Sequence, residues 1–382
     1  MGVLSVGQRR DGRRSGRVAA RRAVVDGQVV EDVAVTYADG VVSSVEQGDR
    51  DPSAPAWLLP GFVDLHCHGG GGASFDGGRA AAERAAATHG RSGTTAMLAS
   101  LVSAPVDVIV EQVRDLAAAI ASGLGPVVGI HLEGPFLSPQ HRGAHDPEAL
   151  VAPTRESVER LVEAGDGHLR MVTLAPELDG ATEAIGLLTE AGVRVAVGHT
   201  DTDYAGARAA FDAGATILTH ASNAMRPVHH RAPGPVVAAL DSAAFLEVIL
   251  DGVHLHDAWA RRLLVDAGRS AALVTDAMAA AGASDGQYDL GGLDVEVRDG
   301  VARLTGSGAI AGSTLTMDRA VRRAVLDLGL DPAAASAAAS LAPASALGLP
   351  GGVLEVGAAA SFVALGDDLR PVGVVREGDA VV

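Results

Sequence analysis

Short apolar runs alternate along the chain with longer stretches in which apolar and polar residues are mixed. The apolar runs have the length of buried strands. They lie at about 59–66, 94–101, 126–132, 168–174, 193–198, 215–220, 245–250 and 271–275. The stretches between most of them are amphipathic and alanine-rich, as surface helices are, for example at 79–90, 106–121, 181–191 and 203–213. Strands that alternate with helices are parallel, and eight of them predict a closed (β/α)8 barrel, the TIM-barrel architecture.

The two ends of the chain have a different pattern, with alternating apolar and polar residues interrupted by turn signals. This pattern predicts short antiparallel strands, and we expect both ends to assemble into one small β-sandwich. A similar pattern near 285–305 predicts a hairpin inserted after the eighth strand. The arginine-rich start of the chain is expected to be a disordered extension. The expected division is an extension at 1–17, a sandwich from 18–58 and 349–382, and a barrel from 59–348.

Polar residues stand where several of the apolar runs end. His66 and His68 are two apart, so on a strand both side chains face the same side. Active sites of this barrel lie at the carboxyl ends of its strands, where these side chains would meet. Imidazole and carboxylate suit zinc and also iron, manganese or cobalt, so we expect one or two divalent ions, with zinc preferred. The full set of strand-end candidates is His66, His68, Glu133, His199, His220 and Asp276.

The composition of the chain limits the classes of molecule that it can be expected to bind. The formal net charge of −17 argues against nucleic acid or an anionic membrane as a partner. One cysteine excludes an internal disulfide and is consistent with a cytoplasmic protein. The chain contains no lysine, so it cannot bridge two metals through a carboxylated lysine, and Glu133 is the available bridge.

Several motifs resemble a known family. The segment PGFVDLHCHG resembles the first-strand signature of the amidohydrolase superfamily. HLEGPFLSPQHRGAHDP, VGHTDTDY, THASNAM, HHRAPG, DGVHLH, LVTDAM and IAGSTLTMD are similar, in order and approximate spacing, to segments of the N-acetylglucosamine-6-phosphate deacetylase family. This resemblance implies a small amino-sugar phosphate as substrate and hydrolysis of its acetamide.

The resemblance also implies roles for individual residues. Glu133, His199 and His220 would hold the main ion and the two strand-one histidines a second. Asp276 would be the general base, and His145 would orient the acetamido group. The sugar phosphate and the pocket wall would be contacted by Asn223, Ala224, Arg231, His254, Ala311 and Gly312. In the family the arginine reaches the neighbouring subunit's site, which implies a homodimer. His141 has no family role and is expected on the surface.

Three alternatives stay open at this point. The same chemistry on another N-acetylhexosamine 6-phosphate, such as the galactosamine epimer, is not separated by the sequence. A different amidohydrolase, for example a dihydroorotase-like or deaminase-like enzyme, is disfavoured by the absence of lysine and by the loop around Arg231. A non-catalytic assembly protein on this fold would be expected to lose metal ligands, and this chain keeps every candidate.

Overall fold

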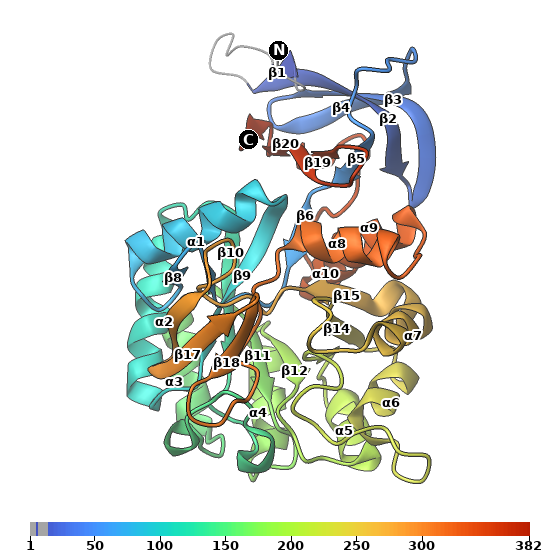
Figure 1. Ribbon diagram of the computed structural model, residues 1–382. Coiled ribbons are helices and arrows are strands. Elements are labelled where there is room, and N and C mark those ends of the chain that lie inside the picture. Colours follow the sequence, from blue (N-terminus) through green and yellow to red (C-terminus); the bar gives the residue numbers. More distant parts are fainter. Residues whose placement is uncertain (1–4, 7–13) are drawn as a thin grey trace.

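The computed structural model describes residues 5–6 and 14–382 and contains a parallel barrel with a smaller sheet beside it (Figure 1). The eight barrel strands lie side by side in chain order, and every pair of neighbours is parallel. They are β6 (Phe62–Asp64), β9 (Thr94–Val102), β10 (Val127–Glu133), β11 (Leu169–Leu174), β12 (Arg194–Val197), β13 (Ile217–Leu218), β14 (Phe245–Ile249) and β15 (Ala271–Val274). The predicted barrel is confirmed.

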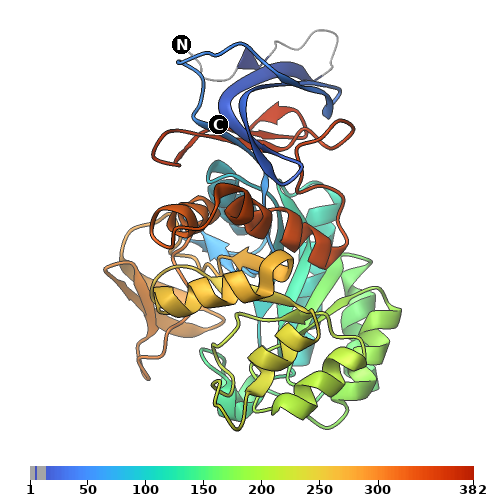
Figure 2. The ribbon, with the colours of Figure 1, turned by 90° about the vertical axis from the view of Figure 1, so that its right-hand side faces the viewer.

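Helices follow the barrel strands and cover the outside of the barrel (Figures 1 and 2). In α2, Ile109, Val113 and Leu116 recur at helical spacing and are buried, which explains why one face packs on the strands. The helices that follow strands are α1 (Arg79–Arg91), α2 (Val106–Ala121), α3 (Arg155–Gly165), α4 (Ala181–Glu190), α5 (Tyr204–Asp212), α6 (Gly234–Asp241) and α7 (Asp257–Ala267). The chain then adds α8 (Met317–Leu326), α9 (Pro332–Ala339) and α10 (Leu341–Leu347).

The first and last barrel strands meet through side chains as well as backbone. Cys67 and Ala277 form a parallel bridge just beyond the ends of β6 and β15. The buried carboxylate of Asp64 accepts hydrogen bonds from the Thr275 hydroxyl at 2.6 Å and from the Thr275 N–H at 3.1 Å. These bonds hold the loops that follow the two strands together at the mouth of the barrel.

The two ends of the chain form one continuous sheet that curls over on itself. Its core includes Tyr37 and Phe362, whose rings are 5.7 Å apart, and an isolated bridge joins Val41 to Ala359 across the curl. The strands are β1 (Ser5–Val6), β2 (Ser15–Val25), β3 (Gln28–Ala38), β4 (Val41–Gln47), β5 (Trp57–Pro60), β19 (Phe362–Leu365), β20 (Pro371–Arg376) and β21 (Asp379–Ala380).

Three boundaries differ from the expectation. The apolar run at 59–66 is split, because β5 pairs with β19 and only β6 enters the barrel. The expected extension at 1–17 lies mostly outside the described residues, and β2 already begins at Ser15. The segment 285–305 forms a three-stranded antiparallel sheet rather than a hairpin, because Gly291 and Gly292 both have positive φ and make an additional turn. Its strands are β16 (Gly286–Leu290), β17 (Leu293–Arg298) and β18 (Val301–Leu304).

The chain within the described residues contains no helix that is both long and apolar enough to cross a membrane.

The glycine-rich segment after β6 forms a small hairpin of β7 (Gly69–Gly70) and β8 (Ala73–Ser74). Backbone hydrogen bonds join this hairpin to the segment that follows β15, for example from the Gly72 N–H to the Ala279 carbonyl at 2.8 Å.

Candidate active site

Six buried polar side chains converge at the carboxyl ends of the barrel strands. Glu133 is the last residue of β10, and the other five lie in the first residues after their strands. Three of them, His199, His220 and Asp276, have positive φ of 47°, 27° and 47°. This left-handed conformation is rare for residues other than glycine, and it turns the backbone sharply just after each of the three strands. The six are His66, His68, Glu133, His199, His220 and Asp276.

One half of the cluster is made by Glu133, His199 and His220. The Glu133 Oε1 atom lies 3.0 Å from His199 Nε2 and 2.9 Å from His220 Nε2, and the two nitrogens are 3.0 Å apart. Three potential ligand atoms therefore face one point at the mouth of the barrel.

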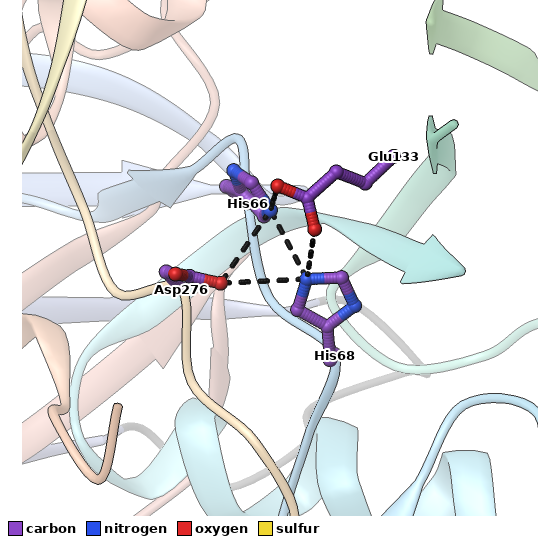
Figure 3. Close-up of side chains that lie close together, drawn as sticks. All are labelled: His66, His68, Glu133 and Asp276. Atoms are coloured by element: carbon purple, nitrogen blue, oxygen red, sulfur yellow. Dashed lines mark hydrogen bonds and ion pairs between the residues drawn. The ribbon is translucent and has the colours of Figure 1, made fainter. Parts of the chain in front are cut away.

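The other half shares the same glutamate and adds the two histidines that follow β6 (Figure 3). His66 Nε2 and His68 Nε2 are 3.0 Å apart. Glu133 Oε2 is 3.2 Å from His68 Nε2, and Asp276 Oδ1 is 3.4 Å from the same atom. His66 Nε2 is 3.4 Å from Glu133 Oε1 and 3.5 Å from Asp276 Oδ1. Glu133 therefore stands between two groups of nitrogen donors.

The hydrogen bonds behind the rings show that these residues fit a divalent metal. His199 Nδ1 lies 2.8 Å from the carbonyl oxygen of His141, which can only accept, so Nδ1 carries the proton. His66 Nδ1 lies 3.1 Å from the carboxylate of Glu247, with the same consequence. Both rings therefore turn Nε2 towards other ring nitrogens and carboxylate oxygens. Such an arrangement needs a positive charge among these groups, either a proton or a metal ion, and outer carboxylates and carbonyls of this kind orient metal-binding histidines.

The electrostatics of the site also favour a cation. Burial acts to lower the pKa of His66, but the carboxylates of Glu133, Asp276 and Glu247 together raise it well above the ordinary value. Burial acts to raise the pKa of Asp276, but the charge of His66 and a hydrogen bond from His68 lower it to about 2. The pKa of Glu133 is also held well below its ordinary value, chiefly by the charges of His66 and His199 against the effect of burial, so these two carboxylates favour a positive charge in this buried site, and a divalent ion can supply it.

The cluster forms one wall of a cavity of about 360 Å³. This is within the size range of small-molecule sites. The cavity is also lined by residues from loops after other strands, including His145, Asn223, Ala224, His254 and Gly312. The candidate metal cluster and several of the residues expected to bind a sugar phosphate therefore share one pocket.

Comparison with known proteins agrees with this geometry. Residues 57–381 match the amidohydrolase family. The chain belongs to the amidohydrolase family. The N-acetyl-D-glucosamine-6-phosphate deacetylase of Mycobacterium smegmatis, solved as a mutant in complex with N-acetyl-D-glucosamine-6-phosphate, is 42% identical with a TM-score of 0.92, over 96% of this chain and 99% of that chain.

Two curated relatives are similar over most of their length. The N-acetylgalactosamine-6-phosphate deacetylase of Escherichia coli O157:H7 is 40% identical over 92% of this chain and 95% of that relative. The N-acetylglucosamine-6-phosphate deacetylase of Vibrio furnissii is 36% identical over 91% of this chain and 90% of that relative. The family predicted from the sequence motifs is therefore confirmed.

Two further pocket histidines of this amidohydrolase have contacts that define their state. His145 Nε2 lies 3.4 Å from Glu133 Oε2, and its Nδ1 accepts a hydrogen bond from the Ser103 N–H at 3.3 Å. Burial lowers the pKa of His145 to about 4, so its ring is neutral with the proton on Nε2. His254 Nδ1 lies 2.7 Å from Asp251 Oδ2. Burial acts to lower the pKa of His254, but the hydrogen bond to Asp251 outweighs burial and raises the pKa above its ordinary value.

Two residues expected at the site do not line the pocket of the single chain. Arg231 is exposed on the loop after β13, where its Nη1 lies 2.7 Å from His230 Nε2. Its role across a subunit interface stays a prediction. Ala311 is fully buried and packs in a small apolar cluster with Met278 beneath the three-stranded sheet. Its neighbour Gly312 lines the pocket instead.

His141 was expected on the surface, and it is partly exposed, but the loop that carries it folds back over the pocket mouth. His141 lines the pocket, and its Nε2 lies 3.0 Å from Asp201 Oδ1. The same carboxylate binds Arg226 through both oxygens, at 2.9 and 2.8 Å.

His131 faces the cluster without joining it, since its ring nitrogens bond the hydroxyls of Ser100 and Thr173 at 2.9 and 2.8 Å.

Sequence reasoning missed two buried carboxylates. Asp64 lies two residues before the first site histidine and binds Thr275 across the barrel closure. Glu247 lies in the middle of β14 and contacts His66. A single carboxylate inside an apolar run, as in FLEVI, was the available signal, because a buried charge needs a partner.

Proposed function

We propose that this amidohydrolase hydrolyses the acetamide of N-acetylglucosamine 6-phosphate to glucosamine 6-phosphate and acetate, in amino-sugar catabolism or recycling. One observation carries the proposal. The carboxylate of Glu133, which contacts all four candidate metal-binding histidines and has Asp276 nearby, opens on the same pocket as His254 and Asn223. The groups that we propose for amide hydrolysis and those that we propose for binding an anion therefore line one cavity. The relatives named for this reaction at 36–42% identity support it.

The residues that would hold the metal follow from the two halves of the cluster. Glu133, His199 and His220 would bind the first ion, and His66 and His68 with Glu133 a second. We propose zinc, while iron, manganese and cobalt suit the same ligands. When bound, the ion would act as a Lewis acid towards the acetyl carbonyl and would lower the pKa of water.

Proton transfer is assigned to Asp276. Its carboxylate is ionised at neutral pH and faces the pocket, so it can take a proton from the attacking water. The leaving amine cannot depart as an anion, so the same carboxyl group would return the proton to the nitrogen. His145 holds a proton on Nε2 towards the pocket and would donate a hydrogen bond to the acetyl oxygen as negative charge develops there.

We assign the phosphate end of the substrate to the part of the pocket away from the candidate metal cluster. The overall charge of −17 repels a dianion, so local donors must compensate. His254, whose pKa the hydrogen bond to Asp251 raises against the effect of burial, would supply one donor, and the backbone and side chain at Asn223 and Ala224 would supply others. Arg231 would come from a second subunit, which makes the working form a homodimer. We further propose that the protein acts in the cytoplasm.

The galactosamine epimer is the second candidate substrate. The curated relative from Escherichia coli O157:H7, 40% identical, is named for that sugar. The two sugars differ only in the orientation of one hydroxyl group, so both would present the same acetamide and phosphate to the pocket.

Acetate release from a matched panel tests both proposals. We expect turnover of one or both N-acetylhexosamine 6-phosphates and much weaker turnover of the unphosphorylated sugars. The ratio of kcat/KM for the two phosphorylated epimers decides between them. A metal-loaded protein that releases no acetate from any member of the panel would refute the deacetylase assignment and favour another amide substrate or a non-catalytic role.

A further inference from the structure

The centre of this barrel is unusual in its polarity. Barrels of this type are filled mainly by branched apolar side chains. Here the buried side chains beneath the pocket include Glu247, His131 and Thr173, none of which lines the cavity. His131 and Thr173 are paired with each other at 2.8 Å. Glu247, whose side chain is fully buried, is the charged member and requires its own explanation.

The contacts of Glu247 connect the two halves of the metal cluster. Its Oε2 atom accepts from His66 Nδ1 at 3.1 Å and from the backbone N–H of His220 at 3.2 Å. Its Oε1 atom is buried and meets no hydrogen-bond donor within the part of the chain that the structure describes. A half-paired buried carboxylate is costly for folding, so its presence points to a charge that the protein side chains do not supply.

The geometry assigns a specific effect to this contact. By accepting from Nδ1, Glu247 fixes the orientation of the His66 ring and aims its Nε2 atom at His68, Glu133 and Asp276. It also adds a further carboxylate to Glu133 and Asp276, the two that face His66 Nε2.

We infer that Glu247 is the positioning residue that enables the His66–His68 half of the site to hold its own divalent ion. Glu247 thereby decides between one ion and two in each subunit. The inference rests on the proposed function only in taking this cluster as the metal site of the hydrolase. The first ion, held by Glu133, His199 and His220, does not depend on Glu247 for a ring contact.

Metal stoichiometry tests the inference without reference to activity. The full-length protein is stripped with a chelator and titrated with Zn(II) or Co(II), and bound metal is counted by calorimetry and elemental analysis. The wild type should bind two equivalents. Glu247→Gln should keep one tight equivalent and bind the second about 10- to 100-fold more weakly, the usual cost of removing an outer partner of a ligating histidine.

Asp64→Asn is the matched control. It also removes a buried carboxylate beside the first strand, but that group touches the His66 backbone N–H and not the ring. It should keep both equivalents even if it lowers the melting temperature. Equal loss of the second ion in both variants would overturn the inference, because it would trace the loss to disturbed strands.

Glu247→Asp covers the case in which Glu247→Gln does not fold. It keeps the charge but withdraws the carboxylate by one methylene, so an intermediate affinity for the second ion is expected, and wild-type affinity would contradict the inference. A wild type that binds a single ion yet releases acetate would refute the role of Glu247 and leave the deacetylase intact. A wild type that binds two ions yet releases no acetate would refute the deacetylase proposal and leave the role of Glu247 intact.

Discussion

The replacement Asp276→Asn separates two roles that the structure allows for one carboxylate. Asp276 Oδ1 lies 3.5 Å from His66 Nε2 and 3.4 Å from His68 Nε2, close enough to help hold an ion in that half of the cluster. It also faces the pocket, as a general base must. Asparagine keeps the size and removes both the charge and the proton acceptor.

The expected size of the effect follows from these contacts. Loss of a general base lowers kcat by about 10²- to 10⁴-fold, or about 2.7–5.4 kcal/mol in the activation free energy. The ion held by Glu133, His199 and His220 should remain, because the Asp276 contacts given by the structure are to the other two histidines. KM for the phosphorylated sugar should change little, since the phosphate end of the pocket is untouched.

The assay combines acetate release with elemental analysis of the same preparations. Asp266→Asn is the control, because Asp266 forms an exposed ion pair with Arg262 on α7, and it should keep wild-type kcat. A near-normal kcat in Asp276→Asn would refute the role as base. A fall in kcat that is fully restored by added metal would assign Asp276 to ion binding rather than to proton transfer.

Three further predictions address the metal, the phosphate and the pH dependence. His220→Ala should lose the main ion and its turnover, with little rescue by added zinc, and full metal content would contradict the ligand set. Arg231→Ala removes a charge-assisted pair worth about 1.5–3 kcal/mol, so kcat/KM for the 6-phosphate should fall about 10- to 150-fold while the unphosphorylated sugar is little affected. Mixed dimers of Arg231→Ala with Asp276→Asn should recover activity, and an absence of recovery in verified mixed dimers would place the arginine in its own subunit's site. The pKa of His254 is raised by Asp251, so its positive charge persists below that raised pKa and is lost as pH rises through it. kcat/KM for the phosphorylated sugar should decline as pH rises through this pKa, and Asp251→Asn should move the decline to lower pH. An unchanged pH profile would show that His254 does not bind the phosphate.

The periodicity of the sequence was sufficient for the architecture. Buried parallel strands must be apolar along their length, and amphipathic helices must cover them, so the eight runs and the intervening helices were visible without a structure. Strand-end positions such as Glu133 and His199 were equally predictable, because the carboxyl ends of barrel strands meet at one mouth. The same local logic predicted that His66 and His68 face one side, and their Nε2 atoms lie 3.0 Å apart although both residues come just after β6.

Tertiary structure decided the contacts between segments that are distant in the chain. Glu247 lies 181 residues from His66, and nothing in either local pattern shows that the two side chains meet. His141 lines the pocket because its loop folds back to Asp201, 60 residues away, while Ala311 turns into an apolar cluster instead. A periodic pattern specifies which face of an element is buried. Which loops close over the mouth, and which buried charges find each other, depends on packing in three dimensions, and these contacts determine how the site can hold its ions.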